Sequence, residues 1–266
     1  MRLLIFTDVD GTLIDHFTYR WDEAIPVLSL LKVLSVPVIL NTSKTYAETL
    51  KLVKEMGLNS PFAVENGAAI FFPEGFSPLP EGCERVGEGY CAVVLGKGYG
   101  EIREFFRKYA ERYNLRGMGD MDLKTLRELT GLSEDALELT KRRMFSEPFV
   151  AGDPDKLREF IRLAERNGYR VLRGGRFYHL VSATQGKGKV VEVVKGLFGE
   201  DVLTVGLGDS ENDEDMLRAV DIPILIPNPR KGYASISIPN LIRAKCLAPR
   251  GWADEVMKVL RTLKLV

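Results

Sequence analysis

Two acidic motifs near opposite ends of the chain have the residue types that phosphoryl transfer needs. The first, Asp8-Val9-Asp10-Gly11-Thr12, follows a short apolar run, and the second is Gly208-Asp209-Ser210-Glu211-Asn212-Asp213. Phosphoryl transfer requires a nucleophile in line with the leaving group, neutralisation of charge and proton handling at the leaving oxygen. Carboxylates can act as nucleophile or proton donor, and they are hard oxygen ligands that suit Mg2+. We therefore expect the two motifs to share one Mg2+-dependent site.

Each residue of this site has a predicted role. Asp8 is the nucleophile, which splits hydrolysis into formation and breakdown of an aspartyl phosphate. Asp10 can point back to protonate the departing alkoxide and then deprotonate the attacking water. Asp8 and Asp209 are expected to ligate the metal. Thr42 offers a hydroxyl and nearby backbone N–H groups, and Lys187 adds a positive charge beside the phosphoryl oxygens.

Each motif alone also has an ordinary structural explanation. Acidic residues after a strand are usually turn or cap residues, and Thr42-Ser43 alone would be a helix cap. Lys187 alone would be a surface lysine. The four pieces follow strands or open a helix in an alternating pattern, and this joint placement favours the catalytic interpretation.

Short apolar strands alternate with helices at both ends of the chain, which indicates a doubly wound, Rossmann-like α/β core with a parallel sheet. In such a sheet, ligands bind beyond the carboxyl ends of the strands, where the polar motifs stand. The expected strands cover residues 3–6, 36–40, 62–64, 202–206 and 222–226, and the expected helices cover 24–34, 45–56, 188–198, 216–220 and 252–263.

An α+β cap domain is expected to interrupt this core. We assign residues 1–82 and 179–266 to the core and 83–178 to the cap. The cap should cover the site and select the leaving group, since a rigid core with variable covering segments is a common division of roles. Its strand-like runs are 90–95, 143–145 and 169–172, and its amphipathic helices are 102–113, 123–129, 133–140 and 154–167.

Composition excludes several classes of protein. Of the 266 residues 45% are apolar, and Lys+Arg and Asp+Glu number 37 each, so no global field attracts nucleic acid or an anionic membrane. No apolar run approaches a membrane span, and the run at residues 3–6 is too short for a signal-peptide core. We expect a cytoplasmic enzyme whose partner is a small phosphate monoester; the sequence predicts no oligomeric state.

The three cysteines, Cys83, Cys91 and Cys246, have no paired metal-ligand spacing. Cys83 and Cys91 could bridge, but free cytosolic thiols are the expectation, because a secreted disulfide scaffold would be smaller and richer in cysteine.

The two acidic motifs, with Thr42 and Lys187, resemble the four signature motifs of the haloacid dehalogenase superfamily, in the right order and elements. The insert between the second and third motifs resembles the α+β cap of its sugar-phosphatase branch. This resemblance implies that Asp10 contributes its backbone carbonyl to the metal and that Asp213 supports or joins the ligands.

Segments 41–45, 64–68, 175–178 and 185–189 resemble the mannosyl-3-phosphoglycerate phosphatase family. That family removes phosphate from a glycosylated phosphoglycerate to make mannosylglycerate, a compatible solute. The resemblance implies a phosphoric monoester hydrolase, in which the substrate carboxylate would pair with Arg176 or Lys44. The candidate substrate-binding residues are Ser43, Lys44, Glu65, Asn66, Arg176 and His179.

Other functions stay open at this point. A related phosphatase could act on glucosyl-3-phosphoglycerate, sucrose phosphate or phosphoglycolate, and a phosphomutase would use the same Asp8 and Asp10. A phospho-accepting regulator would not need Asp10 as leaving-group acid, and dehalogenation would not need Asp10 and Asp209 together. Arg176 could instead make an internal salt bridge, and His179 could simply pack at the domain junction.

Overall fold

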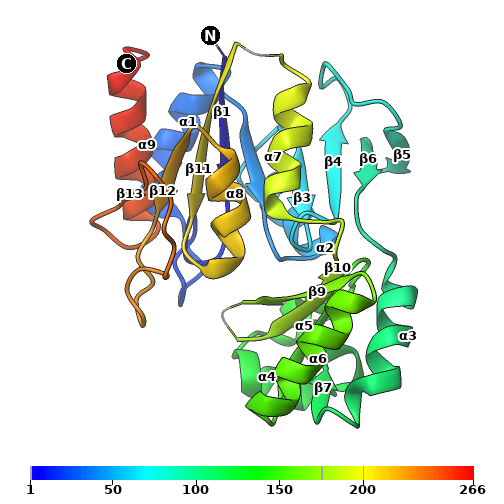
Figure 1. Ribbon diagram of the computed structural model, residues 1–266. Coiled ribbons are helices and arrows are strands. Elements are labelled where there is room, and N and C mark those ends of the chain that lie inside the picture. Colours follow the sequence, from blue (N-terminus) through cyan, green and yellow to red (C-terminus); the bar gives the residue numbers. More distant parts are fainter. Residues whose placement is uncertain (1, 175, 200) are drawn as a thin grey trace.

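The computed structural model describes residues 2–174, 176–199 and 201–266 (Figure 1). Its larger sheet runs in the order β13-β12-β11-β1-β2-β3-β4-β6-β5. The pairs from β13 to β3 are parallel and those from β3 to β5 are antiparallel. These strands are β1 (Arg2–Thr7), β2 (Val38–Asn41), β3 (Phe62–Val64), β4 (Ala69–Pro73), β5 (Glu84–Gly87), β6 (Tyr90–Val94), β11 (Val202–Gly208), β12 (Ile222–Leu225) and β13 (Ile242–Arg243).

Both faces of this sheet are buried, as the uniformly apolar strands predict. In β1, Leu3 and Ile5 pack in one hydrophobic cluster, and Leu4 and Phe6 pack in another. The first cluster includes side chains of α1 (Ile25–Val33), α2 (Tyr46–Glu55) and α9 (Arg250–Thr262). The second includes side chains of α7 (Lys187–Gly196) and α8 (Glu214–Ala219). The doubly wound core is therefore confirmed.

A second, antiparallel sheet of four strands, ordered β7-β8-β10-β9, forms a smaller unit beside the carboxyl ends of the core strands (Figure 1). Phe106, Phe149 and Phe160 centre its own hydrophobic cluster. Its strands are β7 (Leu115–Gly117), β8 (Glu147–Ala151), β9 (Tyr169–Arg173) and β10 (Tyr178–Ser182), and its helices are α3 (Tyr99–Ala110), α4 (Leu123–Thr130), α5 (Glu134–Lys141) and α6 (Pro154–Arg166). Across both units, the described residues also form three short 3-10 helices, η1 (Asp22–Ala24), η2 (Met118–Asp120) and η3 (Glu211–Asp213).

The expected division of the chain differs from the observed sheets. The run 90–95, expected in the cap, includes β6, which pairs with β4 in the larger sheet, and β5 pairs with β6 in turn. A short apolar run carries no signal for the sheet it joins, because pairing depends on distant partners. The expected strand 143–145 is a bend before β8. We propose that the chain leaves the core near residues 95–98 and returns near 183–186.

The expectation of free thiols at Cys83 and Cys91 is wrong. The two residues form a disulfide with a Cα–Cα distance of 5.5 Å, while Cys246 is free. Their approach follows from the hairpin of β5 and β6, which pairs Cys91 with Arg85. Within the described part of the chain, we find no helix with the length and apolar character that a membrane crossing needs.

Candidate active site

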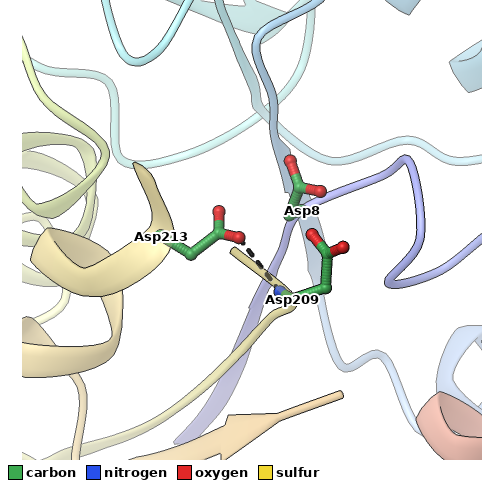
Figure 2. Close-up of side chains that lie close together, drawn as sticks. All are labelled: Asp8, Asp209 and Asp213. Carbon is green, nitrogen blue, oxygen red and sulfur yellow. Dashed lines mark hydrogen bonds between the residues drawn. The ribbon is translucent and has the colours of Figure 1, made fainter. Parts of the chain in front are cut away.

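Asp8 and Asp209 follow neighbouring parallel strands. Thr7 of β1 lies opposite Leu207 of β11, and the backbone N–H of Asp8 donates to the carbonyl of Leu207 at 2.9 Å. The side chains of Asp8, Asp209 and Asp213 face one another at this edge of the sheet (Figure 2). One oxygen from each of the three lies within 4.8 Å of the others. The convergence of the two acidic motifs is therefore observed.

Lys187 joins this cluster from the first turn of α7. Its Nζ lies 2.6 Å from Asp8 Oδ1 and 2.6 Å from Asp213 Oδ1, and the whole side chain is buried. Burial alone would lower the pKa of Lys187, but the carboxylates of Asp213 and Asp8 outweigh it and raise the pKa. Asn41 at the end of β2 holds the backbone of this turn, donating from Nδ2 to the Lys187 carbonyl at 2.9 Å. Lys187 is thus a permanently charged buried group.

Asp213 is fully buried and uses both carboxylate oxygens within the protein. Oδ1 accepts from Lys187, and Oδ2 accepts the backbone N–H groups of Asp209 at 3.0 Å and Ser210 at 3.1 Å. A Cβ on Gly208 would lie 2.4 Å from the Cβ of Asp213, so only glycine fits at this turn. These contacts indicate that Asp213 positions Lys187 and the loop that carries Asp209.

The cluster has an excess of negative charge. The cluster brings together three carboxylates and one ammonium group, so that with every group ionised it would carry two excess negative charges. Burial, only partly offset by Lys187, raises the pKa of Asp8 to about 7. Burial and the neighbouring Asp213 and Asp8 raise the pKa of Asp209 well above its usual range. A cluster of hard oxygen donors with excess negative charge fits a divalent cation such as Mg2+.

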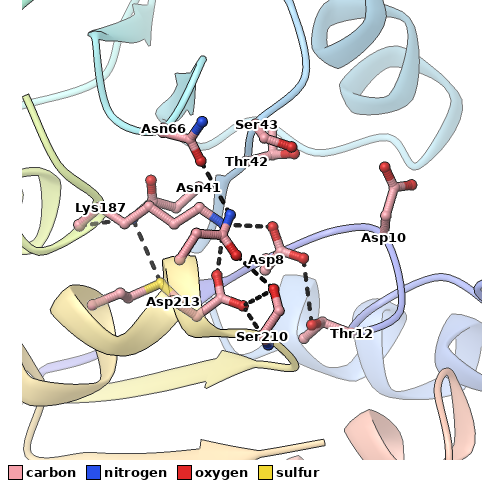
Figure 3. Close-up of polar contacts among 12 residues, drawn as sticks. Asp8, Asp10, Thr12, Asn41, Thr42, Ser43, Asn66, Lys187, Ser210 and Asp213 are labelled. Atoms are coloured by element: carbon pink, nitrogen blue, oxygen red, sulfur yellow. Dashed lines mark hydrogen bonds and ion pairs between the residues drawn. The ribbon is translucent and has the colours of Figure 1, made fainter. Parts of the chain in front are cut away.

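The side chain of Asp10 lies apart from this cluster. Its carboxylate points away from Asp8 (Figure 3) and pairs with Lys44, with 2.7 Å between Asp10 Oδ2 and Lys44 Nζ. Within the described residues Asp10 Oδ1 is buried and accepts no hydrogen bond. Burial would lower the pKa of Lys44, but Asp10 and Glu48 outweigh it and raise the pKa. A proton transfer by Asp10 therefore requires its side chain to turn from Lys44 toward the reacting group.

Thr42, Ser43 and Thr12 lie close to Asp8 (Figure 3). Thr42 is buried, and its Oγ1 accepts the backbone N–H of Lys44 at 3.2 Å. Thr12 Oγ1 donates to Asp8 Oδ2 at 3.5 Å, a contact for which the sequence analysis gave no role. Thr12 follows Asp8 by four residues in a tight loop, and this local spacing is the signal that could have found it.

A cavity of about 400 Å3 separates the two sheets at this edge. Asp8, Asp10 and Asp209 line its core side, together with the loop at residues 231–235 that follows β12. Of the remaining predicted residues, Ser43, Lys44, Arg176 and His179 line it, whereas Thr42, Glu65, Asn66, Lys187 and Asp213 are not among the lining residues. The basic and aromatic sequence Arg230-Lys231-Gly232-Tyr233 was the available signal for the additional loop.

Arg176 and His179, the candidate contacts where the cap returns to the core, differ in burial. His179 on β10 is 7% exposed, and burial, with help from Arg143 and Lys187, lowers its pKa to about 3. Its Nδ1 has no hydrogen-bond partner among the described residues. Arg176 is exposed in the turn between β9 and β10, and no ion pair is found for it within the described ranges. Gly175, part of the family-like segment 175–178, lies outside the described residues.

Glu65, a candidate for substrate binding, is not among the residues that line the cavity. Its buried carboxylate accepts the backbone N–H of Met144 at 2.8 Å and of Phe145 at 3.1 Å, and the Ser146 hydroxyl at 2.6 Å. Glu65 therefore fixes the segment that leads into β8. Asn66 instead accepts a hydrogen bond from Asn212 Nδ2 at 3.1 Å. The sequence could not show that the residue following β3 contacts a segment some eighty residues later in the chain.

Comparison with known proteins agrees with this geometry. A family of haloacid dehalogenase-like hydrolases matches residues 5–77. A protein of Persephonella marina named glucosyl-3-phosphoglycerate/mannosyl-3-phosphoglycerate phosphatase is 42% identical over 266 residues, covering 98% of each chain. A protein of the same name from Methanococcoides burtonii is 36% identical over 268 residues, again covering 98% of each. The solved structure of Thermoplasma acidophilum 0175 covers all of both chains with a TM-score of 0.70 and 18% identity, which supports the fold.

Proposed function

Because the chain belongs to the glucosyl-3-phosphoglycerate/mannosyl-3-phosphoglycerate phosphatases, within the haloacid dehalogenase-like hydrolases, we propose that it hydrolyses mannosyl-3-phosphoglycerate to mannosylglycerate and phosphate. It is a phosphoric monoester hydrolase. The names of both relatives include the glucosyl ester, so glucosyl-3-phosphoglycerate is the second substrate of the proposal. The observation that carries the proposal is the buried group of Asp8, Lys187, Asp209 and Asp213 at the base of a cavity that a small phosphate ester can enter.

In the first step, an Asp8 carboxylate oxygen attacks phosphorus and the bond between phosphorus and the glycerate oxygen breaks. Asp10, turned from Lys44, donates a proton to the departing oxygen, so that an alcohol leaves. Lys187, held 2.6 Å from Asp8, reduces the repulsion between the carboxylate and the incoming phosphate. Thr42, which directly follows β2 and lies close to Asp8 (Figure 3), donates to a phosphoryl oxygen.

In the second step, a water molecule attacks the phosphorus of the aspartyl phosphate while Asp10 accepts the water proton. The bond between phosphorus and the Asp8 oxygen breaks, which releases phosphate and restores the Asp8 carboxylate. Asp8, Asp209 and the backbone carbonyl of Asp10 would hold the divalent cation, supported by Asp213. When bound, Mg2+ would supply two positive charges to the buried cluster and so offset the charge of the phosphoryl group.

We propose that Ser43, Lys44, Arg176 and His179, which all line the cavity, contact the substrate. Asn66, which is not among the lining residues, acts on the substrate through Asn212, which does line the cavity. The partner is a small glycosylated phosphoglycerate.

We also propose that the enzyme works in the cytoplasm. The Cys83–Cys91 disulfide gives this location a test, because disulfides are rare in the cytosol of mesophiles but common inside hyperthermophiles. Thiol labelling of protein quenched in its native cells should find Cys246 reactive and should determine whether the pair is oxidised there.

The function is tested by phosphate release with Mg2+ from mannosyl- and glucosyl-3-phosphoglycerate, sucrose phosphate, phosphoglycolate and a hexose phosphate. We expect the two glycosyl phosphoglycerates to give the highest kcat/KM. Preference for another ester would refute the substrate assignment, and transfer of the phosphoryl group to a sugar without phosphate release would indicate a mutase.

A further inference from the structure

Arg143 is a cation in the cavity wall that the proposed mechanism does not use. Lys44, Arg143, Arg176 and Lys231 all line the cavity. Lys44 is committed to Asp10 at 2.7 Å. Arg143, in contrast, makes no ion pair with any residue in the described ranges; its hydrogen bonds go to two backbone carbonyls. Among the described residues, this guanidinium in the cavity wall therefore has no anionic partner of its own.

The two carbonyl contacts leave most of the guanidinium donors free. Arg143 Nη1 donates to the Ser43 carbonyl at 2.8 Å, and Nε donates to the Thr140 carbonyl at 3.0 Å. A guanidinium has five N–H donors in a planar fork, so Nη2 and the second hydrogen of Nη1 remain available. This arrangement fixes the plane of the group, and a fixed fork binds a carboxylate with two parallel hydrogen bonds.

The guanidinium is also held next to the phosphate side of the cavity. Ser43, which accepts its hydrogen bond, directly follows Thr42 at the end of β2. On the other side, Glu65 holds the backbone of Met144 and Phe145, the residues that follow Arg143. A phosphoglycerate ester carries its phosphate and its carboxylate on one three-carbon acid. A carboxylate site must therefore lie beside the phosphate site, as Arg143 does.

The carboxylates near Arg143 are occupied by other donors. Attraction to Arg143 contributes to the lowered pKa of Glu48 and opposes the burial that raises the pKa of Glu65. However, Glu48 accepts from Thr45 and from the Thr140 hydroxyl at 2.9 Å, and Glu65 is used by residues 144–146. His179 also faces this region, and as a neutral imidazole it can add a donor without a competing charge.

We infer that Arg143 binds the carboxylate of the glycerate moiety and selects phosphoglycerate esters over sugar phosphates that have no carboxylate. The inference rests on the proposed function. It moves the carboxylate contact from Arg176, which is exposed in the turn between β9 and β10, to a guanidinium held by core and cap together. Arg176 and Lys44 then contact the sugar and the phosphate.

The experiment compares kcat/KM for mannosyl-3-phosphoglycerate with kcat/KM for the same compound whose carboxylate is replaced by a primary alcohol. We expect Arg143→Gln to reduce the first value about 30-fold or more and the second less than about threefold, as a buried charge pair losing one partner does. Arg143→Lys, which keeps the charge but loses the fork, should give an intermediate ratio. Arg142→Gln is the matched control, because Arg142 is the exposed neighbour and does not line this cavity.

Each outcome is decisive. Equal losses on both substrates in Arg143→Gln and Arg143→Lys, with the wild type active on mannosyl-3-phosphoglycerate, would overturn the inference and leave the proposed function standing. If Arg143→Gln does not fold, an unchanged ratio in Arg143→Lys would overturn it equally. Absence of wild-type activity on any glycosyl phosphoglycerate would overturn the proposed function, and the inference with it.

Discussion

Acidification tests the environment of His179 directly. A histidine in the unfolded chain titrates near pH 6.5, whereas burial, with Arg143 and Lys187 nearby, lowers the pKa of His179 to about 3. Between these values the unfolded chain binds a proton that the folded chain does not, so stability decreases as the pH falls. The loss between pH 7 and pH 5 is about 2 kcal/mol from this one group. It is insensitive to the folded pKa as long as that value stays well below 5.

The assay is urea unfolding at pH 7 and pH 5, in the presence of a chelator, for the wild type and His179→Gln. Carboxylates titrate in both proteins, so the difference between them isolates the histidine. We expect the wild type to lose about 2 kcal/mol more than His179→Gln over this range. His16→Gln is the matched control: His16 is the second of two histidines and is less buried than His179, and burial with Arg176 and Arg230 lowers its pKa. Equal losses in the wild type and His179→Gln would refute the account of a buried neutral imidazole.

Three further changes test the site. Gly67→Ala should destabilise the fold by about 3 kcal/mol in urea unfolding, because Gly67 has φ +78° and the alanine Cβ would lie 2.3 Å from the Gly186 carbonyl oxygen. Gly75→Ala is the control and should cost much less, because Gly75 has a similar φ of +82° but no neighbour within 4 Å. Asp213→Asn should lower kcat about 100-fold, because an amide has one acceptor oxygen where the carboxylate has two and so cannot accept from both Lys187 and the Asp209 loop; an unchanged kcat would contradict this positioning role. Chelation should abolish activity, and added Mg2+ should restore it. Added Mg2+ should also raise the Tm of the wild type but not the Tm of Asp209→Asn. Equal thermal shifts in both proteins would place the cation elsewhere.

The convergence of Asp8 with Asp209 could be predicted because it needs only local information. Apolar runs identify buried parallel strands, and the carboxyl ends of parallel strands meet at one edge. Asp8 and Asp209 follow β1 and β11, which are hydrogen-bonded neighbours. The lysine at the start of a helix that follows the cap completed the same pattern.

The remaining features depend on contacts between distant segments. The pairing of β6 with β4 placed a run expected in the cap within the core sheet. The ion pair of Asp10 with Lys44 and the hold of Glu65 on residues 144–146 depend on how loops approach one another, which periodicity does not encode. Arg143 was missed for the same reason, because its position is set by the carbonyls of Ser43 and Thr140.

The central claim is that Asp8 carries the phosphoryl group during turnover. The most direct test mixes the enzyme and Mg2+ with mannosyl-3-phosphoglycerate labelled at phosphorus, quenches the reaction in acid within milliseconds and maps the bound label. We predict that label reaches the peptide containing Asp8 before phosphate is released, and that folded Asp8→Asn protein shows neither label nor turnover. Full turnover in Asp8→Asn, or label on a different residue, would contradict the account.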